Sequence, residues 1–232
     1  MSLRADVAPS RRTLTVAATL AAANLLLFIL IAEDLVDGGG LISHDQAVLR
    51  WFVDHRTDRL INAAKLVSTI GSFVSLTILA VLIGIWLWRR GWQPGLAVAP
   101  LAALVLASLA STAAKALFNR DRPPVALHAT TVTLAAFPSG HATDAAAFFV
   151  GASLTLAITT TRRRWIQALF VAAGLTLAAL VGLSRLVLAV HWLSDVVAGW
   201  ALGNAVAISV VVTAWRLTAR RGVSTATHDP YL

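Results

Sequence analysis

The sequence predicts an all-α, polytopic membrane protein with six transmembrane helices and an outer amphipathic helix after the first span. Of its 232 residues, 58% are hydrophobic and only 13% are charged. Soluble domains of ordinary composition carry about 25% charged residues. Several apolar stretches also approach or exceed the roughly 20 residues that cross a bilayer as a helix. These observations favour a membrane protein over a soluble domain.

Six apolar stretches have the length of a membrane span. In chain order they cover residues 13–32, 66–88, 95–118, 142–161, 165–183 and 192–215. The first is longer than the apolar core of a typical signal peptide, so we expect it to remain as a helix. The six spans predict one domain over residues 13–217, between an N-terminal tail (1–12) and a C-terminal tail (218–232).

The long connection after the first span predicts a further helix. Its apolar residues Val48, Leu49, Phe52 and Val53 recur at helical spacing among charged residues. This pattern is typical of a helix with one apolar face. We expect this helix to lie on the outer surface of the membrane.

Basic residues predict the orientation of the spans. Eleven of the nineteen lysines and arginines fall in the two tails and in the second and fourth connections: Arg4, Arg11, Arg12, Arg89, Arg90, Arg162, Arg163, Arg164, Arg216, Arg220 and Arg221. With six spans, these four regions lie on one side of the membrane. The positive-inside rule assigns that side to the cytoplasm. Both tails are therefore predicted to be cytoplasmic, and the first, third and fifth connections to be extracytoplasmic.

Composition also excludes several kinds of chemistry. The chain has no cysteine, which excludes disulfides, thiolate metal sites and a cysteine nucleophile. The net charge of +8 raises the question of nucleic-acid binding. However, the arginines separate hydrophobic spans instead of forming a basic stripe, so we expect contact with a membrane surface and no nucleic-acid partner.

Three outer segments carry most of the candidate functional residues. They are KALFNRDRPP at the end of the third span, FPSGH at the start of the fourth, and SRLVLAVHWLSD between the fifth and sixth. All three lie at the same end of the predicted bundle. The candidates they contain are Lys115, Arg122, Ser139, Gly140, His141, Arg185, His191 and Asp195.

The FPSGH segment has the features of an anion site. Ser139 stands where a helix N-cap is expected, and Gly140 permits close approach to the backbone. The free N–H groups of a first helical turn favour an anion, which would lie beside His141. Capping alone also accounts for a Ser-Gly helix start, so this segment is weak evidence by itself. Asp144, one turn later, is expected to make a secondary polar contact.

His191 and Asp195 are four residues apart and therefore share one helix face. A carboxylate can accept a hydrogen bond from one ring nitrogen and leave the other free as a nucleophile. The alternative is a structural polar pair. We favour a functional pair, because ionisable residues near a membrane interior are costly and are usually retained for function.

Lys115, Arg122 and Arg185 are three cations in neighbouring outer segments. Each one alone is explained by anchoring at the membrane interface. Together they suit a phosphate, which prefers charge-assisted donors. A metal-dependent phosphatase requires grouped carboxylates or other ligands, which these segments lack. We therefore expect a phosphate site without a metal or any other cofactor.

The three segments together resemble the signature of the type 2 phosphatidic acid phosphatase superfamily. The matching motifs are Lys115-x6-Arg122-Pro123, Pro138-Ser139-Gly140-His141 and Ser184-Arg185-x5-His191-x3-Asp195. Their order and internal spacings agree with the family pattern. The second motif alone would be weak evidence, whereas three in register are highly specific. The motifs cover residues 115–195, and the six-span layout extends the resemblance over most of the chain.

The resemblance implies a role for each motif residue. His191 would attack phosphorus and form a phosphohistidine, oriented and charge-stabilised by Asp195. His141 would protonate the leaving oxygen and then activate water. The phosphate-binding residues would be Lys115, Arg122, Ser139, Gly140 and Arg185.

The expected function is metal-independent hydrolysis of a phosphomonoester or terminal diphosphate of a membrane lipid at the extracytoplasmic face. Candidate substrates are undecaprenyl- or decaprenyl-type diphosphates, phosphatidylglycerol phosphate and phosphatidic acid, and no residue separates them. The alternatives are a transporter, a non-enzymatic lipid-binding membrane protein and a vanadium haloperoxidase. A transporter is disfavoured because the charges gather at one end and no pair of broken spans is evident. Haloperoxidases of this superfamily are generally soluble.

Overall fold

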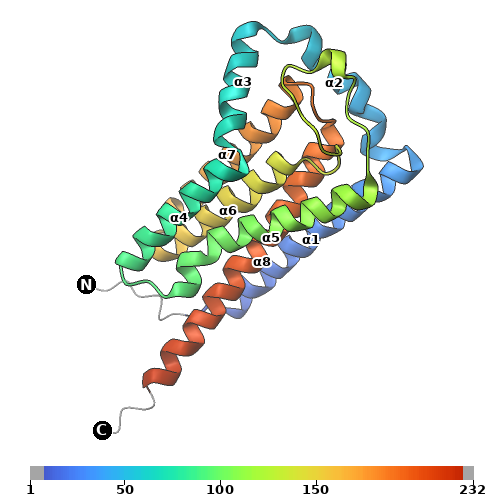
Figure 1. The fold of residues 1–232 in the computed structure, drawn as a ribbon. Helices are drawn as coiled ribbons and strands as arrows, with labels where there is room; N and C mark the ends of the chain where they lie inside the picture. The colour runs from blue at the N-terminus through green and yellow to red at the C-terminus, as the bar shows by residue number, and fades with distance from the viewer. Residues whose placement is uncertain (1–7, 227–232) are drawn as a thin grey trace.

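The computed structural model describes residues 8–226, with side chains over residues 8–219, and every regular element in this part of the chain is helical (Figure 1). The elements are α1 (Arg11–Asp37), η1 (Gly40–His44), α2 (Asp45–His55), α3 (Asp58–Ile70), α4 (Phe73–Arg89), α5 (Pro94–Phe118), η2 (Val125–Leu127), α6 (Gly140–Thr160), α7 (Arg164–Val187) and α8 (Leu193–Ala226). The predicted all-α fold is confirmed.

Five of these helices, α1, α5, α6, α7 and α8, are long and apolar enough to cross a membrane. The pair formed by α3 and α4 gives a sixth candidate span if it is counted as one. The chain is therefore a multi-pass membrane protein, as predicted. The last helix continues to Ala226, well beyond the expected end of the sixth span at residue 215.

The prediction of one continuous helix over residues 66–88 is wrong. α3 ends at Ile70, α4 begins at Phe73, and the two helices are bent by 50°. Ser72 caps α4 through its hydroxyl, which accepts from the Ser75 N–H. Gly71 allows α7 to approach, since a Cβ at this position would lie 2.5 Å from Val181 Cγ1. Hydropathy does not reveal the break because apolar residues continue on both sides of it.

α6 lies at the centre of the bundle and packs against α5, α7 and α8. Its close approach to α8 depends on two glycines of α8. A Cβ at Gly199 would lie 2.8 Å from the Ser139 carbonyl oxygen, and one at Gly203 would lie 2.4 Å from that of Thr143. Small residues at this four-residue spacing let membrane helices pack closely. They hold the start of α6 against the start of α8, where the Ser139 N–H donates to the Asp195 carbonyl oxygen at 2.9 Å.

The predicted amphipathic helix is present as α2, and its apolar face packs within the protein. Leu49 is buried, and Phe52 packs against a cluster that joins Ala64 of α3 to the end of α7 and the α7–α8 connection through Val187, Leu188 and Val190. The start of α2 is also buried through Asp45. Instead of lying only on a membrane surface, α2 covers the segment that leads to His191.

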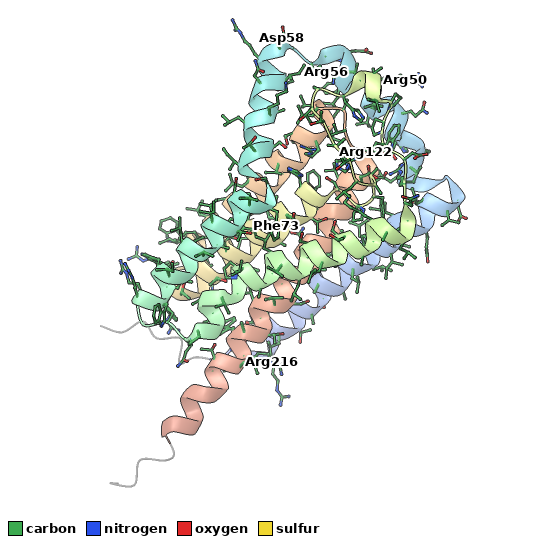
Figure 2. The ribbon with its side chains drawn as sticks, viewed as in Figure 1. Arg50, Arg56, Asp58, Phe73, Arg122 and Arg216 are labelled. Atoms are coloured by element: carbon green, nitrogen blue, oxygen red, sulfur yellow. The ribbon has the colours of Figure 1, made fainter. Side chains whose placement is uncertain are left out.

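The arginine-bearing connections lie at one end of the bundle, opposite the three motif segments. The α4–α5 and α6–α7 turns and the start of α1 share this end, and Figure 2 shows Arg216 far from Arg122. Arg4 and the rest of residues 1–7 and 227–232 of the two predicted tails lie outside the described residues, as do the side chains of Arg220 and Arg221. The end that faces the cytoplasm remains a prediction.

Candidate active site

The structure brings all eight predicted site residues to one end of the bundle. Lys115 lies in the last turn of α5, and Arg122 follows in the α5–α6 connection (Figure 2). The remaining six come from the start of α6, the end of α7 and the α7–α8 junction: Ser139, Gly140, His141, Arg185, His191 and Asp195. Segments that are distant along the chain therefore form one polar cluster, in which Arg122 contacts His191 across 69 residues.

His191 lies between a carboxylate and a guanidinium. Its Nδ1 is 3.3 Å from Asp195 Oδ2, and its Nε2 is 3.0 Å from Arg122 Nη1. A guanidinium can only donate hydrogen bonds, so Nε2 must be the accepting, unprotonated nitrogen. The ring proton is then on Nδ1, directed at the carboxylate. This arrangement fixes the tautomer in which the Nε2 lone pair is available for reaction.

Burial and neighbouring cations keep the His191 ring neutral. The residue is almost fully buried, and burial is the largest cause that holds its pKa well below the ordinary value of 6.5. The positive charges of Arg122 and Arg185 lower the pKa further. Burial also lowers the pKa of Arg122, an effect that Asp195 opposes. A neutral imidazole is the nucleophilic form.

Lys115 and Arg122 both bind the segment that leads into α6. Lys115 Nζ donates to the carbonyl oxygens of Ala135 at 2.7 Å and Pro138 at 2.6 Å. Arg122 Nε donates to the Leu134 carbonyl oxygen at 2.6 Å. The two cations are thereby held next to the start of α6. A Cβ at position 140 would lie 3.7 Å from the Lys115 side chain, which places Gly140 beside this cation.

Two buried polar atoms in this cluster have no hydrogen-bond partner among the described residues. Ser139 occupies the N-cap position of α6 as predicted, but its hydroxyl makes no capping bond and its Oγ is unpartnered. Arg185 donates through Nη1 to Ser68 Oγ on α3, whereas its Nε is unpartnered. Buried polar atoms are nearly always paired. Ser139 Oγ and Arg185 Nε therefore mark a place suited to a polar ligand group.

His141 lies in the first turn of α6 and faces the same set of charges. Arg185, His191, Lys115 and Arg122 all act on it electrostatically. Asp144, one turn further along α6, is buried and interacts with Ser108 and Lys115. Both of these residues lie on α5, and the Oδ1 atom of Asp144 has no hydrogen-bond partner among the described residues, so its secondary role remains a prediction.

Sequence reasoning missed a second layer of polar residues behind His191. Arg120 forms ion pairs with Asp195 and with Asp45. The Ser194 hydroxyl accepts a hydrogen bond from Arg120 and donates one to Asp45. Asp45 carried no signal in the sequence, because it begins an amphipathic helix where charged residues are usually solvated. Arg120 stands two residues before Arg122 in a polar connection, which is its only indication in the sequence.

Within residues 8–226 no group of three or more His, Cys, Asp or Glu side chains is arranged to hold a metal ion. The carboxylates near His191 are instead engaged by Arg120. The expectation that the site uses no metal remains a prediction.

The His191 environment predicts a ring that does not titrate near pH 6.5. Because its folded-state pKa is lowered, the neutral ring with the proton on Nδ1 should persist between about pH 6 and 8. Nitrogen-15 NMR of histidine-labelled protein in detergent, with His191→Gln used to assign the resonance, measures this directly. A His191 resonance that titrates at or above pH 6.5, or that shows the proton on Nε2, would contradict the described geometry.

Comparisons with known proteins agree with the predicted resemblance. The sequence model of the PAP2 superfamily matches residues 96–219, which is more than half of the chain and includes all eight candidate residues. The fold is similar to the crystal structure of the first transmembrane PAP2 type phosphatidylglycerolphosphate phosphatase from Bacillus subtilis, with a TM-score of 0.71 and 22% sequence identity over 93% of this chain and 98% of that one. No curated protein matches this sequence. The chain belongs to the PAP2 superfamily.

Proposed function

We propose that this protein is a metal-independent lipid phosphatase that hydrolyses a phosphomonoester or a terminal diphosphate of a membrane lipid. One observation carries the proposal: His191 lies with Nδ1 3.3 Å from Asp195 Oδ2 and with Nε2 3.0 Å from Arg122 Nη1, the geometry of a neutral ring whose proton is on Nδ1. A nucleophile directed at a cationic group is suited to attack on a bound phosphate, whose charge the cations would hold.

In the first step, His191 Nε2 forms a bond to phosphorus while the bond from phosphorus to the lipid oxygen breaks. The imidazole ring gains positive charge and keeps its Nδ1 proton, so the Asp195 carboxylate at 3.3 Å stabilises the product. The leaving oxygen takes a proton from His141. A bound phosphate anion favours the protonated form of His141, because the two charges are opposite.

In the second step, neutral His141 accepts a proton from water, whose oxygen attacks the phosphohistidine. The bond between phosphorus and Nε2 breaks, inorganic phosphate leaves, and both histidines return to their starting states. The position of His141 at the start of α6, among the cations of the cluster, suits both proton transfers.

We propose that the cations of the cluster and the start of α6 bind the transferred phosphate. Lys115, Arg122 and Arg185 would neutralise the phosphate oxygens, and they would stabilise the charge that develops in the transition state. The unpartnered Ser139 hydroxyl and the backbone N–H groups around Gly140 would add neutral donors at the helix start.

The position of the cluster supports a lipid substrate. It lies at the end of membrane-spanning helices, so a lipid can leave its tails in the bilayer while its headgroup enters the site. We propose phosphatidylglycerol phosphate as the first substrate to test, because the similar solved structure is described as a phosphatase for that lipid. Undecaprenyl- or decaprenyl-type diphosphates and phosphatidic acid suit the same cation set.

The alternatives predict no phosphate release. The sequence shows no broken span, whereas the structure has one, formed by α3 and α4. A broken span is a feature of transporters and therefore favours that alternative. Transporter sites, however, form where broken helices of two repeats meet near the midplane, whereas the charges here gather at one end of the bundle. A non-enzymatic lipid-binding protein would also keep the cations but would not need a reactive His191.

Phosphate release from matched substrates tests the function and separates the two histidines. The purified protein in detergent and excess EDTA should hydrolyse a lipid phosphate and p-nitrophenyl phosphate, and His191→Ala should abolish both activities. His141→Ala should lower turnover of the lipid by about 10²-fold or more, and that of p-nitrophenyl phosphate much less. The reason is that p-nitrophenolate leaves readily without a proton, whereas an alkoxide does not.

His55→Ala is the matched control, because this exposed histidine lies on α2 outside the polar cluster. Equal losses on both substrates in His141→Ala would contradict its role as the acid. Complete inactivation by EDTA that magnesium reverses would contradict the metal-free mechanism.

We propose that the site faces the extracytoplasmic side, since the arginine-bearing connections lie at the other end of the bundle. The cysteine-free chain allows a direct test in intact cells. Thr131→Cys, in the exposed part of the α5–α6 connection, should react with a membrane-impermeant maleimide, whereas Gln93→Cys at the opposite end should not. The reverse labelling pattern would overturn the proposed orientation.

A further inference from the structure

Two buried carboxylates and a largely buried arginine, from separate segments, join behind His191. Arg120, in the α5–α6 connection, donates through Nη1 to Asp195 Oδ1 at 2.5 Å and through Nη2 to Asp45 Oδ2 at 2.6 Å. The exposed fractions of the Asp45, Arg120 and Asp195 side chains are 3%, 11% and 0%. Exposed ion pairs contribute little to the free energy of unfolding, but these three linked charges are largely shielded from water.

The two oxygens of Asp195 have different partners. Oδ1 accepts from Arg120, whereas Oδ2 accepts from the Trp192 N–H at 2.9 Å and lies 3.3 Å from His191 Nδ1. Arg120 therefore holds one side of the carboxylate and leaves the other for the histidine. Rotation of the carboxylate would weaken its contact with the ring.

Asp45 is itself fixed by the first turn of α8. Its Oδ1 accepts from the Ser194 N–H at 2.9 Å, and its Oδ2 accepts from the Ser194 hydroxyl at 2.6 Å. The same hydroxyl accepts from Arg120 Nη1 at 2.7 Å. Asp45 thus acts on α8 as a capping carboxylate supplied by another helix, and it holds Arg120 by a charge-assisted bond.

The three linked charges also bear on the proposed chemistry. If Arg120 paired only with Asp195, its positive charge would cancel the negative charge of that carboxylate. The His191 ring needs this negative charge when the ring itself becomes positively charged. The second carboxylate, Asp45, leaves the group of three with an excess negative charge beside His191. A buried group of this kind is held together by mutual pairing, and loss of one member leaves another charge uncompensated.

We propose that Asp45 is a positioning residue for the reaction: it holds Arg120, which holds Asp195 in the orientation that directs the His191 proton. The inference rests on the proposed function, because positioning matters only if His191 reacts. The inference also gives α2 a part in the active site. This helix covers the α7–α8 connection and supplies Asp45, the outermost of the three linked charges.

The test compares Asp45→Asn with Asp54→Asn in the full-length protein in detergent, with p-nitrophenyl phosphate as substrate. Asp54 lies on the same helix, is exposed, and has no ion pair among the described residues. Its substitution therefore removes the same charge from α2 and leaves the contacts of Arg120 and Asp195 unchanged. Asp45→Asn should lower kcat per folded molecule by about tenfold and leave KM within about twofold. Asp54→Asn should match the wild type.

Nitrogen-15 NMR of the His191 ring gives a second readout that does not depend on turnover. Asp45→Asn should shift the ring away from the pure Nδ1-protonated form, whereas Asp54→Asn should not. If Asp45→Asn does not fold, Ser194→Ala removes the hydroxyl between Asp45 and Arg120 without changing charge. It should lower kcat by about threefold, again with KM retained.

An active wild type in which Asp45→Asn and Ser194→Ala behave like Asp54→Asn, with an unchanged His191 resonance, would overturn the inference and leave the proposed function intact. A wild-type protein that releases no phosphate from any substrate would overturn the proposed function and the inference with it. A fall in activity that only follows the folded fraction, with the His191 resonance unchanged, would assign Asp45 a structural role and also overturn the inference.

Discussion

The buried carboxylate of Asp195 ties together the helix ends at this face of the bundle. A fully buried carboxylate is costly unless charges and hydrogen bonds compensate it. Here Arg120 pairs with one oxygen, the Trp192 N–H and His191 share the other, and the backbone of the same residue accepts from Ser139. Because these partners come from separate segments, the arrangement of the site follows from satisfying this one group.

Close packing of α6 and α8 makes that arrangement possible. Gly199 and Gly203 add no side chain of their own at the contact with α6, so the start of α6 reaches the start of α8. The pair His141 and His191 is thereby held at one end of a bundle whose long helices expose apolar side chains along their lengths. A phosphate bound there would lie among cations, while a lipid tail could remain in the bilayer. We propose that this position of the site, set by the helix packing, favours lipid substrates.

Much of this could be predicted from sequence because the signals are local. Apolar length predicts the spans, and the spacing of His191 and Asp195 predicts their pairing. The break at Gly71 and Ser72 was missed because two capping residues outweigh an uninterrupted apolar pattern. The roles of Asp45, Arg120 and Ser68 were missed for a different reason: each meets its partner only through folding of distant segments. Similarly, the Ser139 position was predictable, whereas the unused capping capacity of its hydroxyl was not.

The central claim is that His191 becomes covalently phosphorylated during turnover, and trapping of the phosphoenzyme tests it most directly. The purified protein is mixed with substrate, quenched rapidly in alkaline denaturant to preserve phosphohistidine, and mapped by mass spectrometry. The account predicts phosphate on His191 and none in His191→Ala. Phosphate on Ser139 or His141, with labelling that persists in His191→Ala, would contradict it.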